Sequence, residues 1–456
     1  MTFKGADSGI RCMLDANKLM DSILLRNAMS KPRLFYGWWV LAGIFVGYTA
    51  LVGIQVYTLP LFYPELKSEF GWSEESITLA ATIFYLTGAC LTPIVSPLFD
   101  RYSAKAFMIA GALITVIGLF AYRWMETLLQ LTIIYMVLAL SQVCAGQVPT
   151  ILIITRWFRR YRGIAVGITL IGTSVGGALF PLLFRQAMDA GGWRDAITVF
   201  MILCGVMMLI PYLFILRSRP EDKGLLPDGD STNTEAAGTP AKPKQSGGPT
   251  LGAALRNPAF YILAFATGAL WFTMNGIYNN LSFFMSDELG ISRDEYSLIF
   301  SAIFWFAIVG KLLFGYLSDR CDKILLMFFV VVLLIIGLAF LRLSSADHLI
   351  SLYGYAAVFG LGFGGTFTMI QLVIAEFFEG RSFARILGIL TSVDVACGGI
   401  AITLLARLRT AFGGSYLPVI EMLIGLTCVN ALMVLILFWK RRKFASLPAS
   451  ALTETG

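Results

Sequence analysis

The sequence predicts an all-α membrane protein with twelve transmembrane helices in two parallel six-helix bundles. Three observations support this prediction: the composition, twelve apolar stretches of bilayer length, and a polar segment that separates six stretches from six. Of the 456 residues, 57% are hydrophobic and only 14% are charged. Soluble domains hold about a quarter charged residues. The chain is therefore expected to fold within a bilayer.

The apolar stretches each lie near the roughly 20 residues that a helix needs to cross a hydrocarbon core. Those of the first half cover residues 34–58, 77–97, 106–123, 128–154, 164–187 and 196–216. Those of the second half cover residues 258–281, 297–317, 324–343, 349–375, 386–409 and 417–438. They predict an N-terminal bundle over 34–216 and a C-terminal bundle over 258–438.

Three polar segments lie outside these bundles. Residues 1–33 contain scattered charges that interrupt any apolar core, so they are expected to form a cytoplasmic arm and not a cleavable signal peptide. Residues 217–257 are rich in Gly, Pro, Ser and Thr, which predicts a flexible cytoplasmic linker without a core of its own. Residues 439–456 are expected to form a cytoplasmic tail.

The positions of Lys and Arg predict the orientation. Placing both termini in the cytoplasm puts most of the 35 Lys and Arg residues on the inner side, including the run at 440–443, as the positive-inside rule requires. The formal net charge of +7 then reflects topology, and no nucleic-acid partner is expected. We expect a monomeric, multi-pass protein of a bacterial inner (plasma) membrane, with lipid as its surroundings.

The two halves repeat each other at a single offset. Residues 70–73 (FGWS) correspond to 289–292 (LGIS), and the Asp-Arg pair at 100–101 corresponds to that at 319–320. Six helices per half is an even number, so both halves run in the same direction through the membrane. Parallel six-helix halves around a site at the membrane midplane are an architecture of alternating-access transport.

Several segments resemble the major facilitator superfamily. Residues 315–320 (GYLSDR) resemble its Gly-x-Leu-Ser/Ala-Asp-Arg loop, and 97–101 (PLFDR) resemble a second copy that has Ser96 or Pro97 where a glycine is usual. Within the superfamily, residues 36–40, 57–62, 70–73 and 157–167 are similar to the oxalate/formate antiporter and monocarboxylate transporter branch. The resemblance covers about residues 33 to 440. It implies that four gating residues hold the halves together on the cytoplasmic side, namely Asp100, Arg101, Asp319 and Arg320.

Lys311 is the most informative single residue, because it places a charge inside the apolar stretch 297–317. An ammonium in hydrocarbon is costly unless it faces a partner or a watery cavity, so such residues are candidates for a functional site. Asp394, in the stretch 386–409, lies at a similar depth when counted at 1.5 Å per residue from the inner helix ends. The two residues are therefore expected to form a buried ion pair.

Two interpretations of this pair remain open. In the functional one, Lys311 binds the carboxylate of a substrate, and Asp394 holds Lys311 when the site is empty. Protonation of Asp394, which burial of a carboxyl group favours, would release the ammonium, so that a proton and an anion enter together. In the structural one, Lys311 extends to the inner surface, or the two residues only join two helices.

The resemblance bears on the substrate. Related anion carriers have an arginine on the eighth helix near Lys311, which implies that the cationic role applies to this position. The monocarboxylate branch has an acid one turn earlier, where this chain has Ala307. The oxalate branch has a second cation on the eleventh helix, near where this chain has Asp394. One cation with one acid fits a monocarboxylate better than a dianion.

Other polar residues inside the predicted spans are candidates for substrate contact. They are Gln55, Tyr57, Gln147, Asn275, Asn279 and Gln371. Such side chains equally serve as structural links between helices, where an interhelical hydrogen bond contributes about 0.6 kcal/mol.

Patterns typical of enzymes and metal sites are discounted. Residues 172–176 (GTSVG) and 360–365 (GLGFGG) match a hydrolase and a dinucleotide-binding pattern, but both lie inside apolar spans, where small residues allow helices to pack closely. The seven cysteines form no C-x-x-C pair, and the one histidine, His348, has no partners at metal-binding spacing. No catalytic residue, cofactor or metal site is expected.

The sequence thus predicts a secondary active transporter of a small organic anion, best fitting a monocarboxylate, that works by proton symport or by exchange for a counter-anion. Two alternatives remain open. One is an exporter of a neutral or amphipathic small molecule, in which Lys311 and Asp394 serve coupling alone. The other is a substrate sensor that transports nothing.

Overall fold

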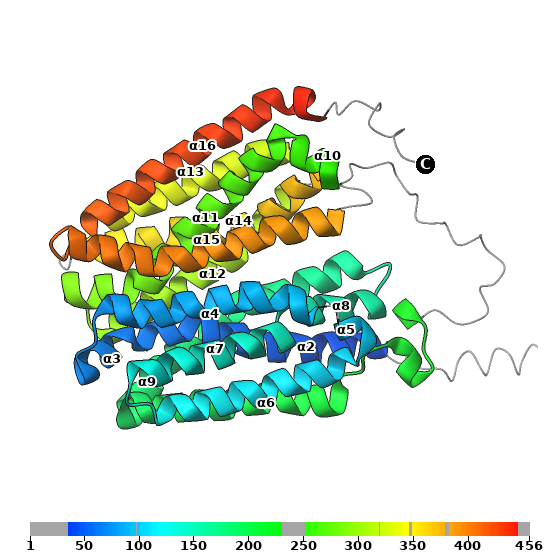
Figure 1. Ribbon diagram of the computed structural model, residues 1–456, viewed down its shortest axis with the longest axis horizontal. Helices are drawn as coiled ribbons and strands as arrows, with labels where there is room; N and C mark the ends of the chain where they lie inside the picture. The colour runs from blue at the N-terminus through cyan, green and yellow to red at the C-terminus, as the bar shows by residue number, and fades with distance from the viewer. Residues whose placement is uncertain are drawn as a thin grey trace, which may run out of the picture.

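The computed structural model describes residues 35–96, 98–229, 251–318, 320–345, 349–378 and 383–445. These residues form long helices that run side by side, and the described part of the chain contains no strand (Figure 1). Eleven helical segments in it are long and apolar enough to cross a membrane. The predicted all-α membrane architecture is confirmed.

The first half of the chain starts with a long helix whose geometry changes along its length. It comprises α2 (Tyr36–Val52), η1 (Gly53–Thr58), η2 (Leu59–Phe62) and α3 (Tyr63–Phe70). Then follow α4 (Glu74–Val95), α5 (Leu98–Arg101), α6 (Ala104–Arg123), α7 (Leu128–Ala145), α8 (Gln147–Trp157) and α9 (Arg162–Cys204), which continues through η3 (Gly205–Leu209) and η4 (Pro211–Ile215).

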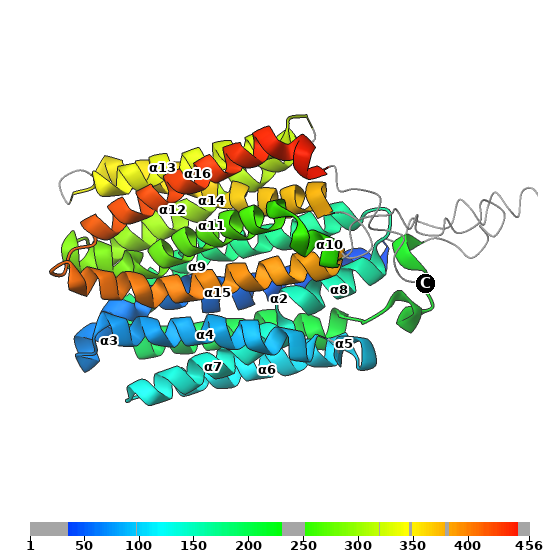
Figure 2. The same cartoon turned by 45° about the horizontal axis from the view of Figure 1, so that its top comes forward.

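The second half consists of α-helices with one π-helical segment, η7. It comprises α10 (Leu251–Arg256), α11 (Pro258–Phe283), η7 (Phe284–Glu288), α12 (Arg293–Ser318), α13 (Lys323–Arg342), α14 (Leu349–Phe378), α15 (Phe383–Ala411) and α16 (Leu417–Ala445). Helices α11 to α16 pack on one another, as do α2 to α9. The two groups meet mainly where α12 packs on α9 and α15 packs on α4 (Figures 1 and 2).

The segment Gly163–Ile215 is two spans joined at a pair of glycines. It counts as one candidate of 53 residues, but Gly191 (φ −172°, ψ 22°) and Gly192 (φ 77°, ψ −172°) interrupt it with non-helical backbone. A positive φ is readily adopted only by glycine, so the chain reverses here. The segment therefore supplies the predicted spans 164–187 and 196–216, and the eleven candidates correspond to twelve crossings.

We refer to two ends of the bundle. The linker end is where α2 begins and α12 ends, and the distal end is where α3 ends and α12 begins. At the distal end the repeated sequences adopt the same local structure. Gly71 and Gly290 both have left-handed backbone (φ 66° and 64°), and Ser73 and Ser292 each accept a backbone hydrogen bond at the start of the next helix.

Part of the predicted flexible linker is structured. Residues 217–229 include the turns η5 (Pro220–Lys223) and η6 (Pro227–Gly229), and residues 251–256 form α10. Asp228 explains part of this order, because its carboxylate accepts hydrogen bonds from the backbone N–H groups of Arg159 and Arg160 (2.9 and 2.7 Å). The arm at 1–33, residues 230–250 and the tail beyond 445 lie outside the described residues.

The two enzyme-like strings are sites of close helix packing. A Cβ atom on Gly176 would lie 2.5 Å from the Thr49 carbonyl oxygen and 2.8 Å from the Cα atom of Gly53. A Cβ atom on Gly364 would lie 2.0 Å from the carbonyl oxygen of Ala307. Glycine is required at both positions because a larger residue would separate the helices.

This packing predicts different effects for two glycines of α9. Gly176→Val should lower the thermal unfolding temperature of the purified protein, because overpacking of this kind costs about 1–3 kcal/mol. Gly167→Val is the matched control, since a Cβ atom there meets nothing within 4 Å. Equal unfolding temperatures for the two variants would contradict the packing explanation.

Candidate functional site

Lys311 lies at the interface between the two halves of the chain. Its side chain is only 9% exposed. The ammonium nitrogen Nζ donates hydrogen bonds to the Leu170 carbonyl oxygen and to Thr173 Oγ1, both at 2.9 Å. Both acceptors belong to α9 in the first half, whereas Lys311 belongs to α12 in the second. The lysine therefore connects the halves through neutral oxygen atoms.

The face of α12 that carries Lys311 also contacts α9 nearer the distal end. Ser301 Oγ donates a hydrogen bond to the Ala178 carbonyl oxygen (2.5 Å), and the ring of Phe304 lies against Gly177. Residues 304 and 311 are two helical turns apart, which places them on the same side of the helix. The α9–α12 contact thus sets the direction of the Lys311 side chain.

Asp394 is buried within the second half. Its residue is 2% exposed, and its carboxyl group lies beside the side chain of Thr267 on α11. Among the described residues, the carboxylate oxygen Oδ1 has no hydrogen-bond partner. An unpartnered buried polar atom is uncommon in native structures, so this residue is a candidate for a functional role.

The predicted ion pair between Lys311 and Asp394 is absent, although the structure describes both residues. Lys311 is directed at α9 of the opposite half, while Asp394 is directed at α11 of its own half. Counting residues from a helix end gives the depth of a side chain but leaves its direction around the helix axis undetermined. Lys311 is therefore not held by Asp394, and the two residues do not join their helices to each other. Burial of Lys311 also shows that it does not extend to the surface.

Aromatic rings cover the distal side of Lys311. We define the aromatic cluster as Tyr57, Phe304, Phe363 and Phe367. The centroid distances are 4.2 Å for Tyr57–Phe304, 5.6 Å for Phe304–Phe363 and 5.3 Å for Phe363–Phe367. Lys311 Nζ lies 5.1 Å from the centroid of Phe367, which is within cation–π range.

Three of the predicted substrate-contact residues lie where the halves meet. Tyr57 belongs to the aromatic cluster, and its carbonyl oxygen accepts a hydrogen bond from the Tyr278 hydroxyl (2.6 Å). Asn275 Oδ1 accepts a hydrogen bond from the Tyr85 hydroxyl of the first half (3.0 Å). The Asn279 side chain lies beside the Tyr85 hydroxyl of the first half, and its Nδ2 donates to the Asn275 carbonyl oxygen one turn earlier (3.0 Å).

The other three predicted contact residues lie elsewhere. Gln55 Nε2 donates to Thr115 Oγ1 (3.0 Å) and Ser141 Oγ (2.8 Å), so it joins helices inside the first half. Gln147 and Gln371 are exposed. A polar residue in an apolar span can link helices inside one half, face the surface, or lie between the halves. The sequence alone did not show which of these positions each residue occupies.

The predicted cytoplasmic gate is described only in part. The guanidinium of Arg320 lies 4.2 Å from the ring centroid of Tyr316, on the same helix end. Asp319 and the side chains of Asp100 and Arg101 lie outside the described residues. The role of these four residues stays a prediction.

Thr173 and Phe367 are site residues that sequence reasoning missed. Thr173 stands in the string GTSVG, which was assigned to helix packing alone. Two adjacent hydroxyl residues inside an otherwise apolar span were the available signal. Phe367 gave no signal, because aromatic residues in membrane helices usually pack or face lipid.

The ammonium of Lys311 forms no ion pair with the acidic side chains that the structure describes. Removing a charged group from water is costly when no opposite charge compensates it. The carbonyl of Leu170 and the hydroxyl of Thr173 supply only partial negative charge. The geometry therefore provides a buried amino group whose charged form a nearby negative charge would stabilise.

The chain is similar to known transporters. It matches the family model for the Major Facilitator Superfamily over residues 44–284 and 264–453. It is 23% identical over 375 residues to human monocarboxylate transporter 6, covering 78% of this chain and 70% of that protein. It is 30% identical to the fujikurins efflux protein of Gibberella fujikuroi over 162 residues, which is 34% of that protein and 35% of this chain.

A solved structure shares the fold. It is a bacterial homologue of the human lysosomal transporter Spinster, in an inward-facing and occupied conformation. The TM-score is 0.67 at 16% identity, with 91% of this chain and all of that chain covered.

The contacts of Lys311 predict a stability difference between two threonines of α9. Thr173→Val should lower the unfolding temperature because it removes an acceptor from a buried ammonium, which costs about 1–3 kcal/mol. Thr169→Val is the matched control, since the Thr169 hydroxyl is equally buried but donates to Ala165 of its own helix (2.9 Å). Thermal unfolding in detergent measures both; a Thr169→Val loss as large as that of Thr173→Val would show that Lys311 is not involved.

Proposed function

This chain belongs to the major facilitator superfamily, a family of membrane transport proteins and not of enzymes, and we propose that it is a secondary active transporter of small organic anions. Monocarboxylates are the substrates that the site fits best. The observation that supports the proposal is the buried ammonium of Lys311, whose hydrogen-bond partners are two neutral oxygen atoms. A substrate carboxylate would supply the missing negative charge.

The position of Lys311 connects substrate binding to movement of the halves. Its two acceptors belong to α9, so an empty site carries a direct link between the second half and the first. A bound carboxylate would compete with these acceptors for the ammonium. We propose that residues 34–216 and 258–438 move as two bodies, and that exchanging this link for a substrate contact assists the movement.

The rings beside Lys311 favour a substrate with one charge and an apolar part. Lys311 contributes one cation, and the aromatic cluster lines its distal side with apolar surface. A dianion would leave a second carboxylate without a matching cation, which is costly in an apolar site. The similarity to monocarboxylate transporter 6 agrees with this choice.

Asp394 is the proposed proton carrier. Its carboxyl group is buried beside a threonine and away from Lys311, and burial without a cationic partner favours the uncharged form of a carboxyl group. A proton on Asp394 and an anion on Lys311 would cross together without net charge movement. Because Asp394 and Lys311 form no ion pair, proton binding at Asp394 would affect anion binding at Lys311 by changing the conformation of the second half. It would not act by breaking an ion pair.

The distal end is the proposed extracellular side. Most of the Lys and Arg residues, including the run at 440–443, adjoin the linker ends of the helices in the sequence, and the positive-inside rule assigns such an end to the cytoplasm. The protein would then reside in an inner or plasma membrane with its linker in the cytoplasm.

Export of an amphipathic compound is the second candidate. The aromatic cluster beside a single cation also suits a larger molecule that carries an acidic group. The similarity to the fujikurins efflux protein covers only about a third of either chain. Transport direction therefore has to be measured separately from binding.

Lys311 is tested by uptake into proteoliposomes. Lys311→Met should reduce uptake of labelled pyruvate or benzoate at least tenfold, because the variant cannot pair with a carboxylate, and Lys311→Arg should retain part of it. Lys323→Met, at the first residue of α13, is the control for loss of one lysine. Undiminished uptake by a well-folded Lys311→Met variant would refute the assignment.

Asp394 is tested by separating exchange from accumulation. Asp394→Asn should keep the exchange of internal for external labelled anion. It should lose the accumulation driven by an inward proton gradient, because the amide side chain cannot take up and release a proton as a carboxyl group does. Both rates are measured in the same vesicles. An unchanged response to the proton gradient would remove Asp394 from the mechanism.

A further inference from the structure

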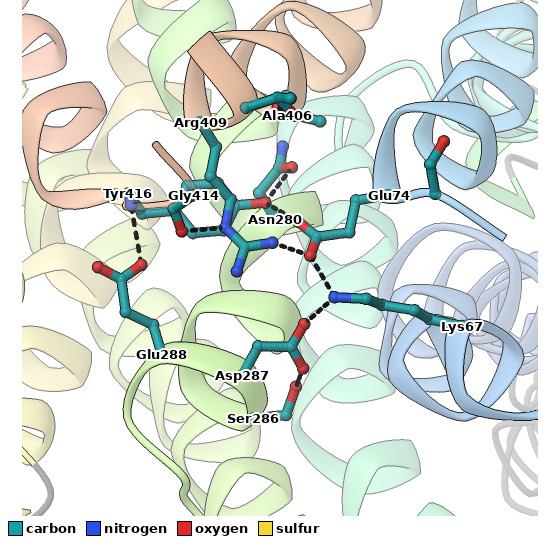
Figure 3. A network of polar contacts seen from close by, with 12 residues as sticks. Lys67, Glu74, Asn280, Ser286, Asp287, Glu288, Ala406, Arg409, Gly414 and Tyr416 are labelled. Carbon is teal, nitrogen blue, oxygen red and sulfur yellow. Dashed lines mark hydrogen bonds and ion pairs between the residues drawn. The ribbon is translucent and has the colours of Figure 1, made fainter. Parts of the chain in front are cut away.

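We infer that Glu74 is the central residue of a gate that closes the distal end of the protein. The gate consists of the Glu74 cluster, which we define as Lys67, Glu74, Asp287, Arg409 and Tyr416 (Figure 3). Glu74 and Lys67 belong to the first half of the chain, and the other three belong to the second. The cluster lies apart from Lys311 and has no part in the proposed substrate contact.

Glu74 binds three partners with one carboxylate, although the residue is only 7% exposed. Oε1 pairs with Lys67 Nζ at 2.6 Å and with Nη1 of Arg409. Oε2 lies 3.0 Å from the Tyr416 hydroxyl. Arg409 and Tyr416 come from α15 and from the turn before α16, so two of the three contacts cross between the halves.

Lys67 adds a third crossing contact. Its ammonium pairs with Glu74 of its own half and also with Asp287 on η7 of the other half. The row Asp287, Lys67, Glu74, Arg409 therefore alternates in charge and passes across the interface twice (Figure 3). Each charge in this row compensates its neighbours, so removing one leaves others without a partner.

The partners on the second half are held in place for this contact. Arg409 Nε donates to the Gly414 carbonyl oxygen (2.8 Å), and its guanidinium lies 4.9 Å from the Tyr416 ring centroid. Glu288 fixes the turn by accepting from Ser415 Oγ (2.5 Å) and from the Tyr416 N–H (2.8 Å). Such supporting contacts indicate a built site and not a chance meeting of surface charges.

Other ion pairs between the halves lie at the same end but are more exposed than the Glu74–Arg409 pair. They are Arg293–Glu65 (3.0 Å), Arg293–Asp189 (3.7 Å), Arg185–Asp294 (2.9 Å) and Arg407–Glu75 (3.5 Å). Exposed pairs contribute little because water and salt screen them. The side chains of Glu74 and Arg409 are only 7% and 14% exposed. Among these ion pairs, loss of the Glu74 cluster should therefore shift the equilibrium between the closed and the open distal end most.

Opening of the distal end requires the halves to separate between Glu74 and Arg409 and between Lys67 and Asp287. Weakening the cluster should therefore raise the population that is open at the distal end. This expectation does not depend on the identity or even the existence of a transported substrate, since it concerns only the equilibrium between two conformations.

A cysteine reporter measures that population. Ser282 of α11 is fully buried and donates a hydrogen bond across the interface to the Pro60 carbonyl oxygen (2.8 Å). In a background with the seven native cysteines replaced, the Ser282→Cys reporter is labelled with a membrane-impermeant maleimide added to the distal side. Adding Glu74→Gln should raise the labelling rate at least fivefold. Glu421→Gln is the matched control and should leave the rate unchanged, because it breaks the pair with Arg342 (2.7 Å), which lies within one half.

A charge exchange tests the same inference without changing Glu74. Lys67→Asp should raise the labelling rate of the reporter, because it places a carboxylate beside both Glu74 and Asp287. Adding Asp287→Lys should lower the rate part of the way back, since it re-forms the pair between positions 67 and 287 while Glu74 still faces a like charge. Unfolding temperatures identify any variant that fails to fold. The inference is overturned if neither Glu74→Gln nor Lys67→Asp changes the rate, or if Glu421→Gln raises it equally.

Discussion

The amino group of Lys311 is buried where the two halves meet, and no acidic side chain among the described residues pairs with it. Lys311 Nζ is held by the Leu170 carbonyl and the Thr173 hydroxyl across the interface of the two halves. A charge in this position is costly in an apolar interior. It is tolerated here because two acceptors face it, and because the ring of Phe367 lies 5.1 Å away. In the proposed function, an anion bound at this position would change how the halves meet.

The contacts between the halves differ in kind along the membrane axis. At the level of Lys311 the contact consists of two hydrogen bonds to neutral oxygens. Toward the distal end it becomes aromatic, with Tyr57 packed on Phe304 at 4.2 Å, and then ionic around Glu74. Apolar and ionic contacts together join the halves toward that end. In the proposed transport function, they would separate the Lys311 site from the distal side.

Much of the fold was predictable from the sequence, because bilayer thickness fixes helix length and the repeat fixes the arrangement of halves. Gly71 and Gly290 show this, since their shared position in the repeat corresponds to the same left-handed backbone. The position of Lys311 along its helix could also be predicted. The direction in which a side chain points around its helix could not be predicted, because it depends on which helix packs alongside. For this reason the sequence did not show that Asp394 lies away from Lys311 or that Gln55 forms its hydrogen bonds within the first half. It did not show the Glu74 cluster because the members come from five separate segments.

The most direct test is a structure determined with a bound monocarboxylate such as benzoate. We predict a carboxylate oxygen within about 3 Å of Lys311 Nζ, with the contact to Leu170 or Thr173 lengthened or broken. This prediction would be contradicted by a structure in which the carboxylate binds elsewhere while Nζ keeps both of its present acceptors.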